Sequence, residues 1–345
     1  MTDRIYLDHA ATTPLDERVL EAMLPYLRDH WGNPSSLYGE AQEARRGLEG
    51  ARRSIAEVLG FKPLELVLTS GGSESDNLAL RGAAYAARRQ GHGEQIITTA
   101  IEHHAVLHEA ERLQEEGFRV TYLGVDGEGF IDLQDLEDAV TDDTALVSIM
   151  YVNNEVGTIE SIEEAVRVVK AKNPRTVFHT DAVQNRRAGT ENVAGVVGMA
   201  EALELAHEEL DARNAHAREL RDRLLRGIPE RIPHVHVTGP EDLSKRAANN
   251  FSACFEYIEG EAILIALDLA GVAASSGSAC TSGSLEPSHV LTALGVPEDL
   301  ARGSLRLTVG TDNAPEQIEH VLEILPGIVS RIRSLSPAWP ERERV

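Results

Sequence analysis

Polar residues follow four apolar stretches of the chain, and their types are suited to holding a charged ligand. Each stretch has the β-branched, apolar composition of a buried strand, so each polar group is expected where a strand ends. In open α/β sheets the carboxyl ends of the strands form the edge at which ligands bind. The groups are Thr69–Ser73 after "ELVL", Glu102 and His103 after "QIITTAI", Asn153–Glu155 after "ALVSIMYV", and Asp181 and Gln184 in "TVFHTDAVQ".

The segment "TSGGSESDN" predicts a loop rich in glycine and serine that opens a helix. The N–H groups and the dipole of a helix N-terminus favour a bound phosphate, to which Ser73 would add a hydroxyl. The segment lacks the lysine of a Walker loop and the glycine spacing of a dinucleotide fingerprint. An ordinary helix cap without a ligand is the alternative.

Asp181 and His103 have the chemistry to hold an aromatic cofactor. A carboxylate at a strand end would pair with a protonated ring nitrogen, and an imidazole would stack over the ring. The alternative for His103 is a loop histidine that satisfies only its own hydrogen bonds. His104 and His108 lie four residues apart on an expected helix, but no third ligand has matching spacing, so the pattern does not predict a metal site.

Cys280 lies in "ASSGSACTSGSLEPS", a stretch of small residues without apolar periodicity. A thiol in such a loop is suited to nucleophilic or redox chemistry. Cys254, in the apolar segment "FSACF", is expected in the core instead. In "GSLRLTVG" the alternation places Arg306 on the polar face of a strand, where its guanidinium would hold a substrate carboxylate or simply face solvent.

The elements that position these residues alternate along the chain, as strands and helices do in a parallel α/β sheet with right-handed crossovers. From about Thr190 a long helical pattern follows, and after it come shorter strands such as "HVHVTG" and "SLRLTVG". The sequence therefore predicts a large α/β domain over residues 15–212 and a small α+β domain over 213–345, with residues 1–14 packing on the small domain.

Composition narrows the class of protein. The chain has 345 residues, a formal net charge of −23 and 42% hydrophobic residues, which is typical of a globular enzyme and disfavours binding to nucleic acid or an anionic membrane. Two cysteines and an N-terminus without a signal-peptide pattern predict a cytoplasmic protein. The acidic, lysine-poor composition fits either a high-salt habitat or a biased genome.

Several motifs, in one order and nearly from end to end, resemble the cysteine desulfurases of the NifS/IscS group. This group belongs to the class V aminotransferase branch of the fold-type I pyridoxal-phosphate (PLP) enzymes. The "SSGSACTS" loop favours this group over the SufS-like one, whose cysteine loop is shorter. The motifs are "YLDHAATTP", "GNPSSLYG", "LTSGGSESDNLA", "EHHAVL", "NNEVGTI", "HTDAVQ", "RAGTENV" and "SSGSACTSGSLEPS".

The resemblance implies how PLP would be held. Gly72 and Ser73 would bind its phosphate, with help from Thr190 of the partner subunit in a homodimer. His103 would stack on the pyridine ring, and Asp181 would pair with the ring nitrogen.

The resemblance also implies how the substrate would react. Asn154 and Gln184 would contact the ring substituents, and Asn154 and Arg306 would hold the carboxylate of L-cysteine. Cys280 would take the sulfur, which gives L-alanine and a persulfide for iron–sulfur cluster assembly or tRNA thiolation.

One family feature is missing from this sequence. In the family a few tens of residues follow "HTDAVQ" and include a "SSHK"-like motif whose lysine forms the Schiff base with PLP. Here Gln184 is followed directly by Asn185, and the remaining lysines are in a turn, at the end of a helix and in a polar loop. The missing segment would also supply two neighbouring strands of the large sheet, so the printed chain is expected to fold poorly. The missing segment is therefore either a true deletion or an omission from the printed sequence.

Two other functions stay open at this point. One is a non-catalytic homologue that binds PLP or a scaffold protein without turning over substrate. The other is a different class V reaction, such as that of a selenocysteine lyase or an aminotransferase, although an aminotransferase has no need for a thiol such as Cys280.

Overall fold

The computed structural model describes residues 4–181, 192–276 and 287–339. The chain forms two compact units, of which the first contains residues 1–13, 80–182 and 214–345 and the second residues 14–79 and 183–213. We call them the sheet unit and the helical unit. Helices α3 (Gly72–Gln90) and α8 (Leu210–Arg231) each run from one unit into the other. The expected division into residues 15–212 and 213–345 stays a prediction.

The helical unit is built from α1 (Glu17–Arg28), α2 (Gly39–Leu59), α7 (Val193–Glu208) and the first turns of α3. Asp16 caps α1 by accepting a hydrogen bond from the backbone of Arg18 at 3.0 Å. Helix α1 approaches α7 closely at Gly198, where an added Cβ atom would lie 2.6 Å from the sulfur of Met23. The core of the unit consists of Ala44, Leu48, Ala51, Ile55, Leu68, Val193, Val196 and Ala200.

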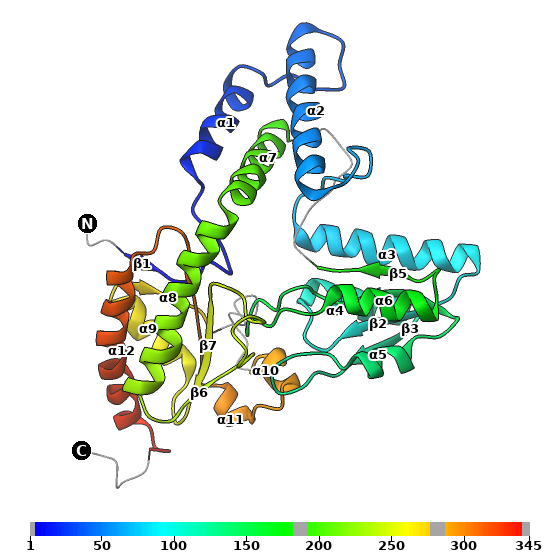
Figure 1. Cartoon of the computed structure of the whole chain (residues 1–345). Helices are drawn as coiled ribbons and strands as arrows, with labels where there is room; N and C mark the ends of the chain where they lie inside the picture. The colour runs from blue at the N-terminus through cyan, green and yellow to red at the C-terminus, as the bar shows by residue number, and fades with distance from the viewer. Residues whose placement is uncertain (1–3, 182–191, 277–286, 340–345) are drawn as a thin grey trace. The chain divides into compact units, whose positions relative to one another are not determined.

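The sheet unit contains a four-stranded parallel sheet in the order β3-β2-β4-β5. Figure 1 shows helices along this sheet, and the α/β class expected from the alternating pattern is confirmed. The strands are β2 (Gln95–Thr99), β3 (Arg119–Leu123), β4 (Thr144–Ser148) and β5 (Val177–His179), and the helices between them are α4 (His104–Glu115), α5 (Leu133–Ala139) and α6 (Ile162–Lys172).

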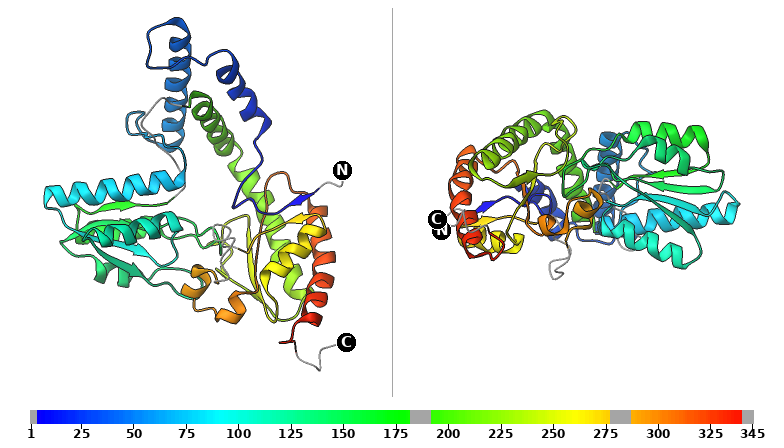
Figure 2. Two further views of the ribbon diagram at one scale, coloured as in Figure 1. Left: turned by 180° about the vertical axis from the view of Figure 1, so that it is seen from behind. Right: turned by 90° about the horizontal axis from the view of Figure 1, so that it is seen from below.

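Both faces of the parallel sheet are covered, as the view from below in Figure 2 shows. Ile97 and Val147 pack with α5 and α6, whereas the neighbouring residues Ile96 and Leu146 pack with α3 and α4. Because consecutive side chains in a strand point to opposite faces, a strand buried on both sides needs apolar residues at consecutive positions. This requirement explains the pair Ile96 and Ile97 in "QIITTA" and the pair Leu146 and Val147 in "ALVSIM".

One expected strand is not formed. Residues 65–70, "ELVLTS", are turn and coil, and none of the described strands pairs with them. A strand needs a neighbour that satisfies its N–H and C=O groups, and the segment missing after Gln184 is the one expected to supply that neighbour. The prediction is therefore wrong for this chain, although Leu68 stays buried in the core of the helical unit.

The remainder of the sheet unit is built around an antiparallel sheet in the order β6-β7-β9, together with a short parallel pair of strands, β1 and β8. Strand β1 pairs with β8, and Asp8, two residues after β1, forms a bridge with Thr308 of β9. The strands are β1 (Ile5–Tyr6), β6 (Val235–Val237), β7 (Asn250–Phe255), β8 (Val272–Ala273) and β9 (Ser304–Thr308), and the helices are α9 (Gly260–Leu269), α10 (His289–Ala293), α11 (Glu298–Ala301) and α12 (Pro315–Leu335).

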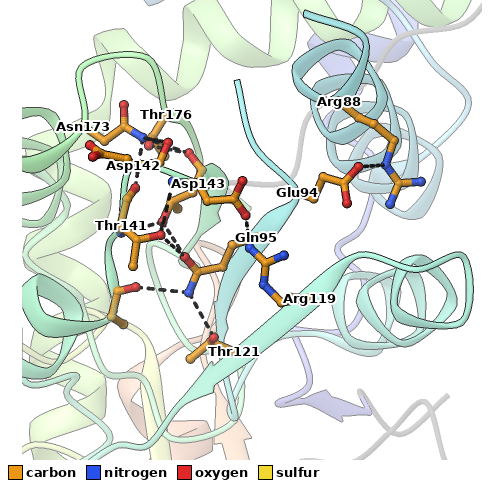
Figure 3. A network of polar contacts seen from close by, with 12 residues as sticks. Arg88, Glu94, Gln95, Arg119, Thr121, Thr141, Asp142, Asp143, Asn173 and Thr176 are labelled. Atoms are coloured by element: carbon orange, nitrogen blue, oxygen red, sulfur yellow. Dashed lines mark hydrogen bonds and ion pairs between the residues drawn. The ribbon is translucent and has the colours of Figure 1, made fainter. Parts of the chain in front are cut away.

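The amino ends of the parallel strands are tied together by a network of polar side chains (Figure 3). Gln95 accepts hydrogen bonds from the hydroxyl groups of Thr141 and Thr144 at 2.9 and 2.7 Å. The side-chain amide of Asn173 donates to the carbonyl of Thr141 at 3.0 Å. The polar side chains at this edge of the sheet therefore bond mainly to one another and to nearby backbone groups. No helix in the described part of the chain is both long and apolar enough to span a bilayer.

Candidate active site

At the carboxyl edge of the same sheet, Glu102 joins the ends of β2 and β4. Its side chain is fully buried, and one carboxylate oxygen accepts hydrogen bonds from the Thr99 hydroxyl and the Met150 backbone N–H, both at 2.8 Å. A buried carboxylate needs such donors because it has lost its hydration. Glu102 thereby fixes the backbone immediately before His103.

His103 is the N-cap residue of α4. Its Nδ1 atom accepts a hydrogen bond from the Ala105 N–H at 3.1 Å, so the ring proton of the neutral form is on Nε2. The imidazoles of His104, His108 and His289 gather beside it, and the rings of His104 and His289 are 4.5 Å apart between centroids. Burial lowers the pKa of His104, and repulsion from the neighbouring imidazoles lowers it further. Among the described residues, no three His, Cys, Asp or Glu side chains are arranged so that they could hold a metal ion.

The turn after β4 is shaped by Asn153, which is 1% exposed. Its amide donates to the Ile101 carbonyl at 3.0 Å, and its oxygen accepts from the N–H groups of Glu155 and Val156 at 2.9 and 3.0 Å. This arrangement leaves the neighbouring Asn154 exposed. The sequence pattern "NNE" marked the turn but did not separate the structural asparagine from the exposed one.

Glu155 connects this turn to the segment that follows the Cys280 loop in the sequence. Its carboxylate accepts a hydrogen bond from the Ser288 hydroxyl at 2.5 Å, and Ser288 in turn caps α10. Burial raises the pKa of Glu155, although the hydrogen bond from Ser288 opposes this shift. The next residue, His289, contacts the carbonyl of Glu102 at 3.0 Å. Sequence reasoning assigned no role to Ser288 or His289, because their partners are more than 100 residues away.

A small cavity of about 20 Å³ lies between these groups, and His103, Asn154, Glu155 and His289 are among the residues that line it. Its volume is about that of one water molecule. The cavity brings together two of the residues predicted to bind the cofactor, His103 and Asn154.

Arg306 is buried, with 2% of its surface exposed, so it does not face solvent as the alternative required. Its Nη1 donates to the Asn154 carbonyl at 2.9 Å, and its Nη2 forms an ion pair with Asp8 at 2.8 Å. Its role toward a substrate stays a prediction. Cys254 is fully buried as expected, and burial raises the pKa of its thiol to about 12.

The other predicted site residues are distributed as follows. Asp181 is half-buried after β5, and its carbonyl accepts from the Tyr151 N–H at 3.2 Å. Gly72 and Ser73 are the first residues of α3 and belong to the helical unit. Gln184, Thr190 and Cys280 lie outside the described residues.

The four lysines of the chain are engaged elsewhere. Lys170 donates to the Thr176 carbonyl at 2.5 Å, and Lys245 lies over the Phe130 ring at 5.3 Å. Lys62 and Lys172 form ion pairs with glutamates at 3.7 and 4.0 Å, and their side chains are 84% and 41% exposed. No lysine lines the cavity.

The family model described as aminotransferase class V matches residues 5–187 and 184–321. The chain belongs to the class V aminotransferase family. It is 42% identical to the cysteine desulfurase IscS of Clostridium botulinum (strain Hall) over 393 aligned positions, which cover 99% of the chain and 98% of that protein. It is 43% identical to the IscS of Dictyoglomus turgidum, with 98% and 97% covered.

Solved structures show the same fold. A NifS-like protein superimposes with a TM-score of 0.87 at 33% identity and covers 95% of this chain and 100% of its own. The apo structure of a cysteine desulfurase from Thermococcus onnurineus NA1 has a TM-score of 0.83 at 23% identity, with 95% of each chain covered. The fold-type I architecture expected from the resemblance is thereby confirmed.

The comparisons also locate the missing segment. The alignment with the C. botulinum relative has 393 positions, which is 48 more than the 345 residues of this chain. The two parts of the family match meet at residues 184–187, which is the place where a segment is expected to be absent.

Family members depend on PLP, and the described residues fit this cofactor only in part. His103 and Asn154 line one cavity and provide an imidazole and an amide for the ring. The expected roles of Asp181 toward the ring and of Gly72 and Ser73 toward the phosphate stay predictions. No lysine lines the cavity, so the described residues place no amine for covalent attachment there.

Proposed function

We propose that this protein, in a form that contains the lysine segment, is a PLP-dependent cysteine desulfurase. The reaction converts L-cysteine and the Cys280 thiol into L-alanine and a persulfide on Cys280. The observation that carries the proposal is the 42% identity to an IscS over 99% of the chain, together with the position of Cys280 in the "SSGSACTS" loop.

PLP supplies the electron sink that weakens the bonds of the amino acid attached to it. The residues of this chain would provide binding and orientation. His103 would stack over the ring, Asp181 would keep the ring nitrogen protonated, and Gly72 and Ser73 would bind the phosphate at the start of α3. Arg306 would hold the substrate carboxylate, and Cys280 would receive the sulfur as a thiolate.

The absence of a suitable lysine favours a second candidate for the printed chain itself. Such a chain would hold PLP by non-covalent contacts at most and would act as a non-catalytic homologue, for example as a scaffold-binding protein. The intact mass of the protein purified from its natural source separates the two forms. A mass of 37.5 kDa corresponds to the printed chain, and a larger mass corresponds to a chain with the segment.

The activity is tested by comparing two proteins, the printed chain and the same chain with the C. botulinum relative's segment inserted between Gln184 and Asn185. With PLP, the inserted chain is expected to release L-alanine from L-cysteine, whereas the printed chain is not. The matched control carries the same insert with its lysine changed to alanine. Equal activity of all three proteins would contradict the role of the lysine, and no activity in the inserted chain would count against the proposed function.

A Cys280→Ser variant of the inserted chain is expected to lose persulfide formation. Selenocysteine as substrate distinguishes a desulfurase from a selenocysteine lyase, because only the lyase would prefer it strongly. We further propose a cytoplasmic homodimer that passes sulfur to an iron–sulfur scaffold, a role in line with the IscS names of its relatives, or to a tRNA-thiolation acceptor. Mass measurement in solution tests the dimer.

A further inference from the structure

The guanidinium of Arg306 is held from two sides by segments that are far apart in the sequence. Its Nη1 donates to the carbonyl of Asn154 at 2.9 Å, and its Nη2 contacts the Asp8 carboxylate at 2.8 Å. The Arg306 side chain is 2% exposed and that of Asp8 is 19% exposed. Two contacts on different terminal nitrogens fix both the position and the plane of a guanidinium.

Asp8 is itself held in place by the backbone around it. The Thr308 N–H donates to the carbonyl of Leu7 at 2.8 Å, and the His9 N–H donates to the carbonyl of Thr308 at 3.3 Å. The Tyr6 hydroxyl donates to the carbonyl of Asp8 at 3.1 Å. Because these bonds tie the N-terminal segment to β9, the carboxylate of Asp8 has a defined position beside Arg306.

We propose that Asp8 is a positioning residue that orients Arg306 for the carboxylate of the substrate. The proposal rests on the proposed function, in which Arg306 binds L-cysteine. A guanidinium binds a carboxylate best when its planar set of donors is already aimed, because less freedom is then lost on binding. Asp8 sets this orientation by accepting a hydrogen bond from Nη2, and the carbonyl of Asn154 accepts one from Nη1.

The competing role for Asp8 is neutralisation of a buried charge without any effect on orientation. A buried guanidinium without a nearby carboxylate destabilises the folded protein. An ion pair would offset this loss of stability whatever the orientation of the guanidinium plane. The two roles differ in what they require. Orientation needs an acceptor oxygen at this place, whereas neutralisation needs the negative charge.

The test compares Asp8→Asn, which keeps an acceptor oxygen but removes the charge, with Asp8→Ala, which removes both. In the lysine-containing, PLP-loaded enzyme we expect Asp8→Ala to raise the KM for L-cysteine about tenfold, the effect of one lost charge-assisted hydrogen bond. The kcat is expected to change much less. In Asp8→Asn the KM is expected to stay near or below that of the wild type, because the acceptor remains and one negative charge near the substrate is gone.

Asp268→Asn is the matched control, since Asp268 forms an exposed ion pair with Arg4 elsewhere in the same unit. It is expected to leave the KM unchanged. Asp8→Leu, which fills similar space without an acceptor, replaces Asp8→Ala if that variant does not fold. A KM in Asp8→Asn as high as in Asp8→Ala would overturn the proposal, as would an unchanged KM in both.

Binding of propionate gives a readout that does not depend on turnover. Propionate carries a carboxylate and no amine, and its affinity for the PLP-loaded protein is measured from the rise in melting temperature across a titration. We expect Asp8→Ala to bind propionate more weakly than the wild type does, and Asp8→Asn to bind it at least as tightly as the wild type. If the wild type binds propionate in this pattern but releases no L-alanine from L-cysteine, the proposed function fails and the role of Asp8 stands. If propionate affinity is the same in all variants, the role of Asp8 fails.

Discussion

Asn153 and Asn173 are two buried asparagines at opposite edges of the parallel sheet, and each organises a turn. Asn173 is 2% exposed, and its amide donates to the carbonyls of Thr141, Asp142 and Thr144. Asn153 is 1% exposed and makes a similar set of contacts at the carboxyl edge. The two side chains perform the same local task with similar burial.

The two edges differ in what lies around these turns. At the amino edge the polar groups bond to one another and close the network shown in Figure 3. At the carboxyl edge the turn exposes Asn154, directs its carbonyl to Arg306 and places the carboxylate of Glu155 against Ser288. Similar local chemistry therefore builds a structural edge in one place and a candidate active site in the other.

The largest effects are expected from removing the two asparagines. Asn153→Ala and Asn173→Ala should each lower the free energy of unfolding by about 2–4 kcal/mol, because each leaves several buried backbone groups without partners. Denaturant unfolding measures this loss. Only Asn153→Ala should also reduce the formation of L-alanine from L-cysteine by the lysine-containing form, since only its turn carries Asn154.

If Asn173→Ala reduces kcat/KM as much as Asn153→Ala when both proteins are folded, the proposed difference between the two edges of the sheet is wrong. Activities are therefore measured well below the unfolding transition of the weaker variant. Equal losses would mean that the sheet transmits damage from either edge to the site.

A smaller effect is expected from Glu160, which follows the turn at the carboxyl edge. Burial raises the pKa of Glu160 from 4.5 to about 7, with a further contribution from repulsion by Asp126. The native state thus binds a proton more tightly than the unfolded state, so this stabilisation is complete below about pH 4.5 and is lost as the pH rises through 7. The shift corresponds to at most about 3 kcal/mol.

Glu160→Gln cannot ionise and keeps an oxygen that can accept the 3.2 Å hydrogen bond from the Ile131 N–H. We expect the variant to match the wild type near pH 5 and to exceed its stability at pH 8. Denaturant unfolding across this range measures the difference. Parallel stability curves for the two proteins would show that Glu160 does not titrate in the native state.

The sequence predicted those parts of the site that depend on local patterns. The apolar runs indicated β2, β4 and β5, and the polar residues after them do lie at the carboxyl edge. His103 was expected beside a helix start and is the N-cap of α4. Each of these features is fixed by residues within a few positions of one another.

Features that depend on distant partners were not predictable. The alternation in "SLRLT" placed Arg306 on a polar face, but its ion-pair partner, Asp8, lies 298 positions away in the sequence. The strand expected at "ELVLTS" fails for the same reason, because a strand exists only if a neighbour pairs with it. The link from Glu155 to Ser288 spans 133 positions and left no local signal.

The smallest effect is expected at the surface of the amino edge, where Arg119 forms an ion pair with Asp143 (Figure 3). Their side chains are 62% and 48% exposed, so water screens the attraction and the pair contributes below about 1 kcal/mol. Arg119→Gln should leave both the unfolding free energy and kcat/KM nearly unchanged. A loss as large as that in Asn173→Ala would show that this edge depends on charge pairing, and the contrast with the carboxyl edge would then rest on electrostatics instead of buried hydrogen bonds.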